Sequence, residues 1–442
     1  MPHPYLPHTP EDIAAMCARI GISSPDELFA DIPRKLRYKG PYKLDAALTE
    51  DEIRDFFNRP DTLTPRDLCL LGMGWYVHSC PSVVPYIAQR SEFLTSYTPY
   101  QPEISQGTLQ YIFEYQSMMC ELTGLDVSNA SMYDGSTAMA EAMMMCVAAT
   151  RKRHRVIVSG TVYPHYLEVM KTYARYHGVD LTILGEEGGV TDFGPLDREL
   201  AKGDVAGVIL QTPNLFGILE DFTGIAERVH AAKALLVIST PASALGVLKT
   251  PAAWGADIAA GDAQSLGMPL NFGGPGLGYL CCTKALMRKL PGRIVGATTD
   301  AEGHRCFVLT LQAREQHIRR DKATSNICSN QGVMTLWAAM YLALMGASGL
   351  REVNRLSCNG AHYFRTRLCE TGLFEEAFPG THFLNEFTVR YKGDMPLDDL
   401  LELLSFSPGV NINDDLFTIA VNETQSQETL NMIVEMIKLA AK

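Results

Sequence analysis

Several features that define common protein classes are missing from this sequence. The formal net charge is -12, so there is no basic excess of the kind that binds nucleic acid. The 11 cysteines include no Cys-x-x-Cys pair, and with histidine they form no cluster at metal-ligand spacing. These absences predict neither a disulfide framework nor a metal site, and they favour the reducing cytoplasm. The first residues also lack the basic and apolar regions of a signal peptide.

Apolar runs long enough to span a membrane are scarce. The best candidate is the segment 333–350, which carries no charged residue. It contains tryptophan, tyrosine, threonine and several small residues, and it stands alone in a chain that is 46% hydrophobic and 20% charged. We therefore interpret it as a buried core helix and expect no membrane partner.

The chain of 442 residues is long enough for more than one domain. Its first part lacks strong strand patterns and contains three helix-start signals, each a hydroxyl before proline and acids, at Thr9, Ser24 and Thr64. We expect a helical N-terminal extension that wraps a neighbouring body, then a large α/β domain and a small C-terminal α/β domain. The expected ranges are 1–95, 96–330 and 331–442.

In the middle of the chain, apolar runs of strand length alternate with helical stretches. The strand-like runs are 156–158, 181–184, 207–210 and 234–238, and the helical stretches between them include 166–177 and 224–232. This alternation predicts a parallel, doubly wound sheet that is buried on both faces. Ligands of such sheets bind at the carboxyl ends of the strands, so the loops 211–214 and 239–241 are expected near a site.

A glycine-rich loop, 261–279, lies between two further apolar runs, 256–260 and 279–282. In pyridoxal-phosphate (PLP) enzymes of the aspartate aminotransferase type, this layout carries the lysine that holds the cofactor as a Schiff base. The loop contains no lysine here. Its polar side chains are Asp262, Gln264, Ser265 and Asn271.

Three other segments each allow two interpretations. Gly-Ser-Thr at 135–137, before a helix over 139–150, is either a phosphate cradle or an ordinary N-cap. The extended loop 97–107, with two prolines, is either a surface loop or part of a substrate site. The polar segment 293–330 is either a solvated face or a binding surface for a carboxylate or an acidic partner. His317, which lies within it, is more typical of a structural histidine than of a catalytic base.

Together these motifs resemble the P-protein of the glycine cleavage system, and more narrowly the first, or alpha, subunit of its two-chain form. The resemblance covers essentially the whole chain and rests on 97–107, 129–142, 211–221, 261–278 and 309–331. It implies an α/β fold of the PLP-dependent transferase type (fold type I), with a mainly parallel, seven-stranded sheet. It also implies two alpha and two beta chains, decarboxylation of glycine, and transfer of the aminomethyl group to the lipoyl arm of the H-protein.

The same resemblance indicates which half of the enzyme this chain is. Aligning the glycine loops places Gln264 where the Schiff-base lysine belongs, and Thr240, two dozen residues earlier, where an aspartate should hold the pyridine nitrogen protonated. A glutamine amide cannot form the imine, and an uncharged threonine leaves the ring a poor electron sink. We therefore predict that PLP is bound covalently by the partner, subunit 2, and that no residue of this chain alone is catalytic.

Side chains that serve the shared site are expected in three sets. The expected substrate or interface residues are Tyr97, Thr98, Tyr100, Gln101, Glu103 and Ser105 in the extended loop, with Arg314, His317, Arg320 and Lys322 near the interface or the lipoyl-arm entrance. The cofactor-binding loops, kept as vestiges or shared with the partner, contain Asp134, Gly135, Ser136, Thr137, Gln264, Asn271, Gly273 and Gly274. No metal ligand is expected.

Two alternatives remain open at this point. The chain could be an autonomous PLP enzyme that uses another lysine, of which Lys249 and Lys284 are the nearest to the loop. It could also be a non-catalytic scaffold subunit. A nucleotide-binding dehydrogenase is disfavoured, because the glycine run lies between strands and no helix pattern or ribose-binding acid follows it.

Overall fold

The computed structural model describes residues 5, 7–57, 68–150, 152–323, 325–404, 406, 408–413 and 415–441. Contacts divide the chain into two compact units, Met1–Thr62 and Leu63–Lys442. By its contacts, the segment 68–95 goes with the second unit, although the sequence grouped it with the N-terminal extension. The expected division at 330 stays a prediction.

The described residues of the first unit form the helices α1 (Pro10–Ile20) and α2 (Glu50–Phe57) and the short 3₁₀ turns Pro25–Phe29 and Arg34–Leu36. The predicted cap of α1 is confirmed: the Thr9 hydroxyl accepts from the Asp12 amide at 3.2 Å, and the Asp12 carboxylate accepts from the Thr9 amide at 2.9 Å. Ser24 precedes the first 3₁₀ turn. The third predicted helix start, at Thr64, lies outside the described residues.

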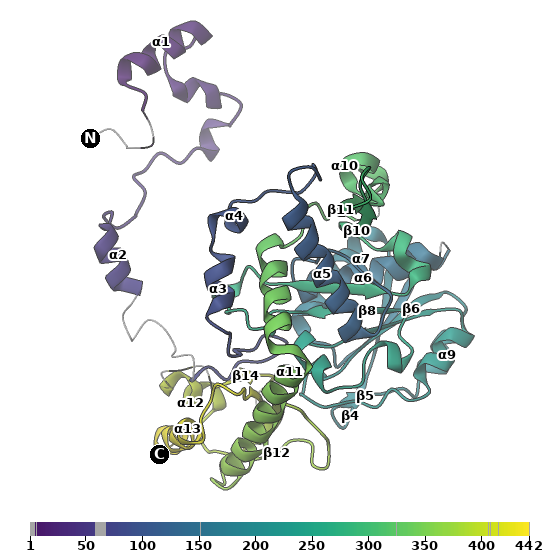
Figure 1. Ribbon diagram of the computed structural model, residues 1–442. Helices are drawn as coiled ribbons and strands as arrows, with labels where there is room; N and C mark the ends of the chain where they lie inside the picture. The colour runs from purple at the N-terminus through teal and green to yellow at the C-terminus, as the bar shows by residue number, and fades with distance from the viewer. Residues whose placement is uncertain are drawn as a thin grey trace. The chain divides into compact units, whose positions relative to one another are not determined.

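The second unit is built on a seven-stranded sheet with the order β1-β9-β8-β7-β6-β2-β3 (Figure 1). Its strands are β1 (Val127–Ser128), β2 (Arg155–Ser159), β3 (Asp180–Leu184), β6 (Val205–Gln211), β7 (Leu235–Ser239), β8 (Ile258–Asp262) and β9 (Gly278–Cys282). β3, β2, β6, β7 and β8 pair in parallel, while β9 runs antiparallel to both β8 and β1. The predicted mainly parallel sheet is therefore confirmed, and every predicted strand lies in it.

The sheet is buried on both faces because its strands alternate apolar side chains between two cores. On one face, Val158, Val237 and Leu280 pack against α6 and α7. On the other face, neighbours such as Leu236 and Tyr279 pack toward α5, α9 and α11. These helices are α5 (Gln106–Thr123), α6 (Gly135–Thr150), α7 (Pro164–His177), α9 (Ile225–Ala231) and α11 (Gly332–Cys369), and shorter ones are α3 (Val83–Ala88), α4 (Ser91–Leu94), α8 (Leu196–Leu200) and α10 (Gln316–Arg319).

The apolar segment near residue 340 forms the first part of α11. This helix is long and apolar enough to cross a membrane by composition alone. Within the fold, however, the Trp337 indole donates to the Gly267 carbonyl at 3.1 Å, and Tyr341 is fully buried in the core that contains α3 and α5. The helix bends at Gly346, where the backbone is not helical, and then continues to the small domain. The interpretation as a core helix accounts for these contacts.

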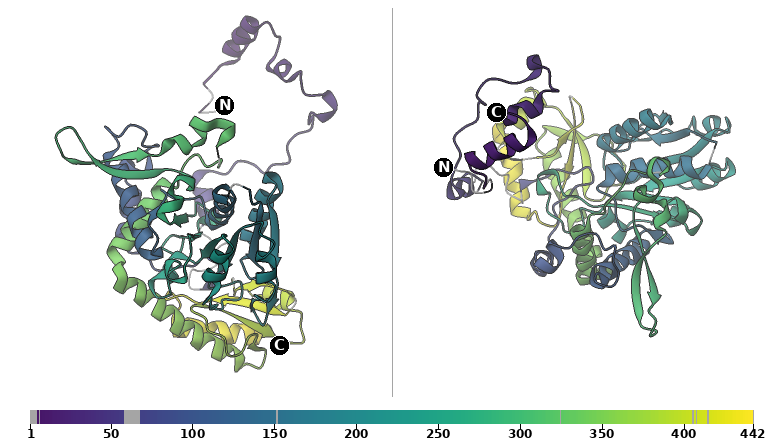
Figure 2. Two further views of the ribbon diagram at one scale, coloured as in Figure 1. Left: turned by 90° about the vertical axis from the view of Figure 1, so that its right-hand side faces the viewer. Right: turned by 90° about the horizontal axis from the view of Figure 1, so that it is seen from above.

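Residues after 369 form a four-stranded antiparallel sheet with the order β12-β13-β15-β14, in the region where the sequence predicted strands and helices of a small α/β domain. Its elements are β12 (Phe374–Glu376), β13 (Glu386–Tyr391), β14 (Val410–Asn411) and β15 (Leu416–Ala420), with α12 (Leu397–Leu403) and α13 (Gln427–Ala440). Two hairpins complete the second unit. The pair β4 (Glu186–Glu187) and β5 (Val190–Thr191) is short, whereas β10 (Ile294–Thr299) and β11 (Arg305–Thr310) form a ribbon that projects from the body (Figure 2).

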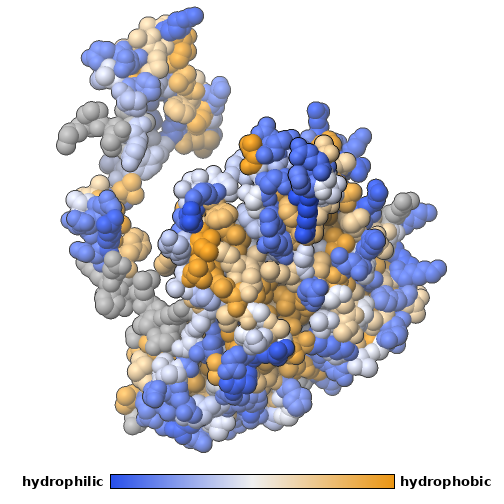
Figure 3. Space-filling model, viewed as in Figure 1, coloured by the Kyte–Doolittle hydropathy of each residue, from blue (hydrophilic) through white to orange (hydrophobic). Residues whose placement is uncertain are grey.

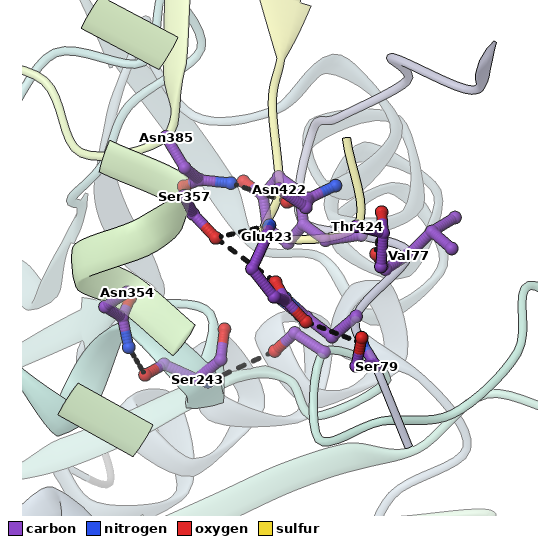
Figure 4. A network of polar contacts seen from close by, with 12 residues as sticks. Val77, Ser79, Ser243, Asn354, Ser357, Asn385, Asn422, Glu423 and Thr424 are labelled. Atoms are coloured by element: carbon purple, nitrogen blue, oxygen red, sulfur yellow. Dashed lines mark hydrogen bonds and ion pairs between the residues drawn. The ribbon is translucent and has the colours of Figure 1, made fainter. Parts of the chain in front are cut away.

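Beyond Leu68, the segment 68–80 contains no helix or strand, yet hydrogen bonds to residues that follow β8 and β15 hold it in place. Figure 4 shows Glu423, which follows β15, accepting hydrogen bonds from the Ser79 amide at 2.6 Å and the Ser357 hydroxyl at 3.2 Å. The Thr424 hydroxyl donates to the Val77 carbonyl at 3.2 Å. The contacts to the Ser79 amide and the Val77 carbonyl pair backbone groups of the segment, while Ser357 holds the Glu423 carboxylate in place, so the segment is fixed without a helix or strand.

We predict that Gly217→Ala destabilises the second unit by about 3 kcal/mol or more, because two penalties coincide. Gly217 has φ +79°, and an added Cβ would lie 2.1 Å from the Glu386 carbonyl oxygen on β13. Gly203 is the matched control, since its φ is +77° but nothing lies within 4 Å of an added Cβ. Gly203→Ala should cost only about 1 kcal/mol. Urea unfolding measures both variants, and equal losses would contradict the close approach.

Candidate functional site

The carboxyl ends of β7 and β8 bring together the two positions that the sequence singled out. Thr240 follows β7 and Gln264 follows β8, and these strands are parallel neighbours. The N-terminus of α6 lies beside them, since the Gly135 amide donates to the Asp262 carboxylate at the end of β8 at 3.0 Å. We call this place the socket: Gly135, Thr240, Asp262 and Gln264.

Gln264 uses every part of its amide within the chain. Its Nε2 donates to the carbonyls of Tyr76 at 2.9 Å and Met268 at 2.6 Å, and its Oε1 accepts from the Tyr76 amide at 2.8 Å. The side chain is fully buried. The glutamine thus pairs with the backbone of residue 76 as a neighbouring strand would, and it pins the segment 68–80 into the socket.

Three tyrosines fill the space next to this clamp. Tyr76, Tyr163 and Tyr166 are each at most 2% exposed. The Tyr76 hydroxyl donates to Glu386 at 2.8 Å and lies 3.3 Å from the Tyr163 hydroxyl. The Tyr166 hydroxyl lies so close to Gly135 that an added Cβ there would be only 2.1 Å away. Packing this tight leaves no room for an aromatic ligand.

The Gly-Ser-Thr turn at the start of α6 is an N-cap in this structure. The Asp134 carboxylate accepts from the Thr137 amide at 2.7 Å and from the Thr137 hydroxyl at 2.9 Å. Asp262 takes the Gly135 amide, as described above. Two carboxylates of the chain itself therefore occupy the amides that a phosphate would use. Ser136 lies between these residues and is largely buried.

Two buried carboxyl groups at the socket have raised pKa values. Burial raises the pKa of Asp262 to about 7, although its hydrogen bonds from the Gln264 and Gly135 amides oppose the shift. Burial likewise raises the pKa of Glu386 to about 7, against hydrogen bonds from the Met73 amide and the Tyr76 hydroxyl. Both groups cost the folded state free energy when they ionise.

The residues of the socket do not fit PLP. An amide stands where a lysine amine must form the covalent link. At the position aligned with the aspartate that holds the ring nitrogen, the uncharged Thr240 hydroxyl is buried without a hydrogen-bond partner. The helix amides are already bound, and tyrosines fill the remaining space. Within the described part of the chain, no group of three or more His, Cys, Asp or Glu side chains is placed to hold a metal ion.

A well-formed opening lies elsewhere, beside the extended loop. A cleft of about 410 Å³ is lined by Leu94, Ser96, Tyr97, Thr98, Pro99, Thr108, Tyr111, Ile112, Pro275, Arg293, Ser329, Asn330, Gln331, Gly332, Val333 and Met334. It therefore joins three segments that the sequence singled out separately: the loop 97–107, the glycine loop, and the end of the polar segment. None of these lining residues is acidic, so the cleft suits a neutral or anionic ligand.

The expected residues of the extended loop divide by position. Tyr97 and Thr98 line the cleft, and Tyr97 is 86% exposed. Tyr100 lies behind them, with its hydroxyl 3.1 Å from Arg293 Nη2. Gln101 and Glu103 are exposed and do not line the cleft, and Ser105 immediately precedes α5.

The glycine loop forms the opposite rim of this region. Gly273 is exposed, and nothing lies within 4 Å of a Cβ added there. Gly274 is half-buried, and the Asn271 amide donates to the Pro275 carbonyl at 3.2 Å. Phe272 is 92% exposed. The middle of the loop, 271–275, presents an accessible edge. Its two ends approach other backbone closely, since a Cβ added at Gly261 would lie 2.7 Å from the Thr240 carbonyl oxygen and one at Gly278 would lie 2.2 Å from the Asp134 carbonyl oxygen.

The four expected residues of the polar segment are not one cluster. Arg314 is half-buried and donates to the carbonyls of Gly292 at 2.9 Å and Leu311 at 3.0 Å. His317 packs edge-on against the Tyr100 ring, with centroids 5.8 Å apart. Arg320 and Lys322 are exposed. Only His317 is thereby connected to the extended loop.

The residue that the sequence analysis missed is Arg293, which is 2% exposed and lines the cleft. A single arginine after Leu-Pro-Gly carries no pattern that distinguishes a ligand-binding cation from a surface one. The only available signal was its position at the junction between an apolar turn and the polar segment. Asn330, its neighbour in space, is 37 positions away in the chain.

The sheet order, the loop between β8 and β9 and the socket at the strand ends define the class of PLP-dependent enzymes of fold type I. Distant solved structures share this fold. An alanine–glyoxylate aminotransferase from Nostoc sp. has 14% identity and a TM-score of 0.61, with 90% of this chain and 100% of that chain covered. A glutamate decarboxylase from Lactobacillus brevis has 13% identity and a TM-score of 0.67, with 95% and 96% covered.

The chain belongs to the glycine cleavage system P-protein family, whose pattern matches residues 3–437. It is 45% identical, over 98% of each chain, to the probable glycine dehydrogenase (decarboxylating) subunit 1 of Geobacillus thermodenitrificans. The protein of the same name from Carboxydothermus hydrogenoformans is 46% identical, with 98% of this chain and 99% of that protein covered. A crystal structure of glycine decarboxylase (P-protein) in inhibitor-bound form superposes with a TM-score of 0.85 at 42% identity, with 99% of this chain and 100% of that chain covered.

The raised pKa of Glu386 predicts how stability depends on pH. The unfolded glutamate titrates near pH ~4.3 and the folded one near 7, so the folded state binds more protons between these values and its stability falls as pH rises. Glu386→Gln should remove this component, about 1.4 kcal/mol per pH unit at most. Urea unfolding at several pH values should show little difference near the acidic end and a more stable variant above pH ~7. Parallel pH profiles would contradict the assignment.

We predict that Gln264→Lys does not give this chain a covalent cofactor. The new amine would enter a space already filled by Tyr76 and the carboxylates, and the lost hydrogen bonds should destabilise the chain by about 2 kcal/mol or more. The purified variant is incubated with PLP, reduced with borohydride and examined by visible absorption and mass, with the wild-type chain as control. A PLP adduct on the introduced amine would overturn the account of the filled socket.

Proposed function

We propose that this chain is subunit 1 of the two-chain glycine decarboxylase, glycine dehydrogenase (aminomethyl-transferring), of the glycine cleavage system. In this proposal, two such chains combine with two copies of subunit 2 in the cytoplasm. The complex removes carbon dioxide from glycine and transfers the aminomethyl group to the lipoyl arm of the H-protein. PLP, bound covalently by subunit 2, supplies the electron sink for the bond cleavage. The names and full-length similarity of the relatives support this assignment.

The observation that carries the proposal is a contrast between two parts of the same fold. The socket that would hold a cofactor is closed by Gln264 and Tyr76, which are at most 2% exposed. The loops around the cleft remain accessible, with Tyr97 86% and Phe272 92% exposed. A chain with a closed socket and open loops is suited to completing the site of another chain.

The surface around the cleft also has the character of an interface. Exposed apolar side chains gather over α3, α4 and α11 and the adjoining loops, including Tyr86 at 70%, Leu94 at 57% and Leu344 at 54% exposed (Figure 3). Apolar patches of this kind mark protein–protein contacts more often than chance. We assign this surface to the contact with subunit 2.

Within the assembled enzyme, each predicted residue receives a proposed role. Tyr97 and Thr98 donate hydrogen bonds to the substrate or cofactor of subunit 2, and Tyr100, with His317 packed on its ring, supports their loop. The interface or the lipoyl-arm entrance is formed by Gln101, Glu103, Ser105, Arg314, Arg320 and Lys322. Asp134, Gly135, Ser136, Thr137 and Gln264 maintain the fold, while Asn271, Gly273 and Gly274 present the accessible loop.

An autonomous PLP enzyme receives no support from the two lysines that the sequence offered. Lys249 and Lys284 are both exposed, and the Lys249 ammonium lies 3.5 Å from the centre of the Trp254 ring. Co-expression with subunit 2 distinguishes the proposals, because it measures PLP content and glycine–bicarbonate exchange for each chain alone and for the pair. Activity that requires both chains, with PLP on subunit 2, supports the proposal. A PLP-loaded and active single chain overturns it.

For the assembled enzyme, we predict that Tyr97→Ala and Thr98→Ala each lower kcat/KM for glycine about tenfold or more, since each removes a donor to a charged ligand. Tyr176→Ala is the matched control, because Tyr176 is 77% exposed but lies on α7, which covers the opposite face of the sheet from α5 and α11. Glycine–bicarbonate exchange per assembled enzyme is the measurement. Unchanged turnover in the loop variants would favour a scaffold role.

A further inference from the structure

Arg293 is a buried cation whose described contacts are neutral. Its side chain is 2% exposed. Nη1 lies 3.3 Å from the side-chain oxygen Oδ1 of Asn330. Nη2 lies 3.1 Å from the Tyr100 hydroxyl, and the guanidinium carbon is 5.2 Å from the centre of the Tyr100 ring. Among the residues that the structure describes, no carboxylate forms an ion pair with it.

A second buried arginine of this chain, in contrast, is paired with carboxylates. Arg155, at the start of β2, is 5% exposed and pairs with Glu199 and Asp204 at 2.6 Å each. Buried charges are usually compensated in this way, because an isolated charge loses its hydration without replacement. Arg293 lacks this compensation although it is more deeply buried.

Two hydrogen-bond donors beside the charge are also unused. The Nε–H group of Arg293 and the side-chain NH₂ group of Asn330 are buried and have no acceptor. Single buried donors without partners also occur elsewhere in this chain, as at Arg365 and Arg367, but here two of them belong to side chains that contact each other and line one cleft. Arg293 and Asn330 line the cleft of about 410 Å³ together with Ser329, Gln331 and Thr98, which add hydroxyl and amide groups.

An arginine with these neighbours suits a carboxylate ligand. The guanidinium offers a planar edge, Nε–H and one Nη2–H, that matches the two oxygens of a carboxylate. The Asn330 and Tyr100 contacts hold the plane of the guanidinium, and Tyr100 belongs to a loop that carries no helix or strand between α4 and α5.

We propose that Arg293 binds the carboxylate of the amino-acid substrate, and that Asn330 and Tyr100 are positioning residues that orient its guanidinium. This inference rests on the proposed function, because it places one end of the shared site on this chain. It assigns the recognition of an α-carboxylate to a residue outside the socket. A substrate without a carboxylate would then bind weakly, whatever its amine.

The most selective test is Asn330→Asp in the two-chain enzyme. The new carboxylate keeps the acceptor for Nη1 but gives Arg293 an internal counter-ion, so the substrate must compete with it. The Kd of glycine, measured from the visible absorption of the assembled enzyme, and the KM should both rise about tenfold or more. Thermal stability should stay equal or increase, because an unpaired buried charge gains a partner.

Two variants of the arginine itself complete the test. Arg293→Gln should raise the Kd and KM for glycine at least as much, and Arg293→Lys should fall between, because it keeps the charge but loses the planar edge. PLP content and assembly should not change. Arg155→Gln is the matched control: it removes a buried arginine far from the cleft, and should lower stability while leaving the Kd of glycine unchanged.

Three results would overturn the inference. An unchanged Kd of glycine in Asn330→Asp and Arg293→Gln would leave Arg293 a purely structural residue. Loss of PLP at normal glycine affinity would reassign it to the cofactor phosphate, and loss of assembly would reassign it to an ion pair with the partner. Failure of the proposed function looks different, because the wild-type pair would then show no glycine–bicarbonate exchange at all.

Discussion

The structure depends on one clamp, the three hydrogen bonds between Gln264 and the backbone of Tyr76 and Met268. This clamp brings the segment 68–80 to the carboxyl ends of β7 and β8, where parallel sheets of this class place their ligand. Once the segment is there, Tyr76 meets Glu386 and Tyr163, and the socket closes. The chain therefore keeps the architecture of a cofactor enzyme and uses its central position for packing.

Because the socket is closed, the start of α6 and the cleft near the extended loop compensate buried charge in different ways. At the start of α6, Asp134 and Asp262 supply the negative charge that a phosphate would otherwise bring. At the cleft the situation is reversed, since Arg293 has a positive charge and lacks a carboxylate among the described residues. Both places follow the rule that a buried charge is compensated. At the start of α6 the chain supplies the compensating charge itself, whereas at the cleft the charge of Arg293 is left for a ligand.

Much of the fold could be predicted from the sequence, because continuous apolar runs of strand length that alternate with helical stretches specify a doubly wound sheet directly. The replacements at the socket, Thr240 for an aspartate and Gln264 for a lysine, could also be predicted, because each can be recognised from the identity of a single aligned residue. The filling of the socket was not, since Tyr76 lies 188 positions from Gln264 and no local pattern joins them. Arg293 was not predicted for the same reason. It stands out because no described carboxylate pairs with it, and this can be seen only from the residues that surround it in three dimensions.

The path of segment 68–80 has a mechanical consequence. Residues in and after the C-terminal sheet hold it through Glu423, Thr424 and Glu386, while the end of β8 holds it through Gln264. Any hinge motion between the two sheets would have to break several buried hydrogen bonds at once, which opposes such a motion. If substrate entry requires domain closure, we expect the partner chain to undergo that motion and this chain to provide a rigid surface for it.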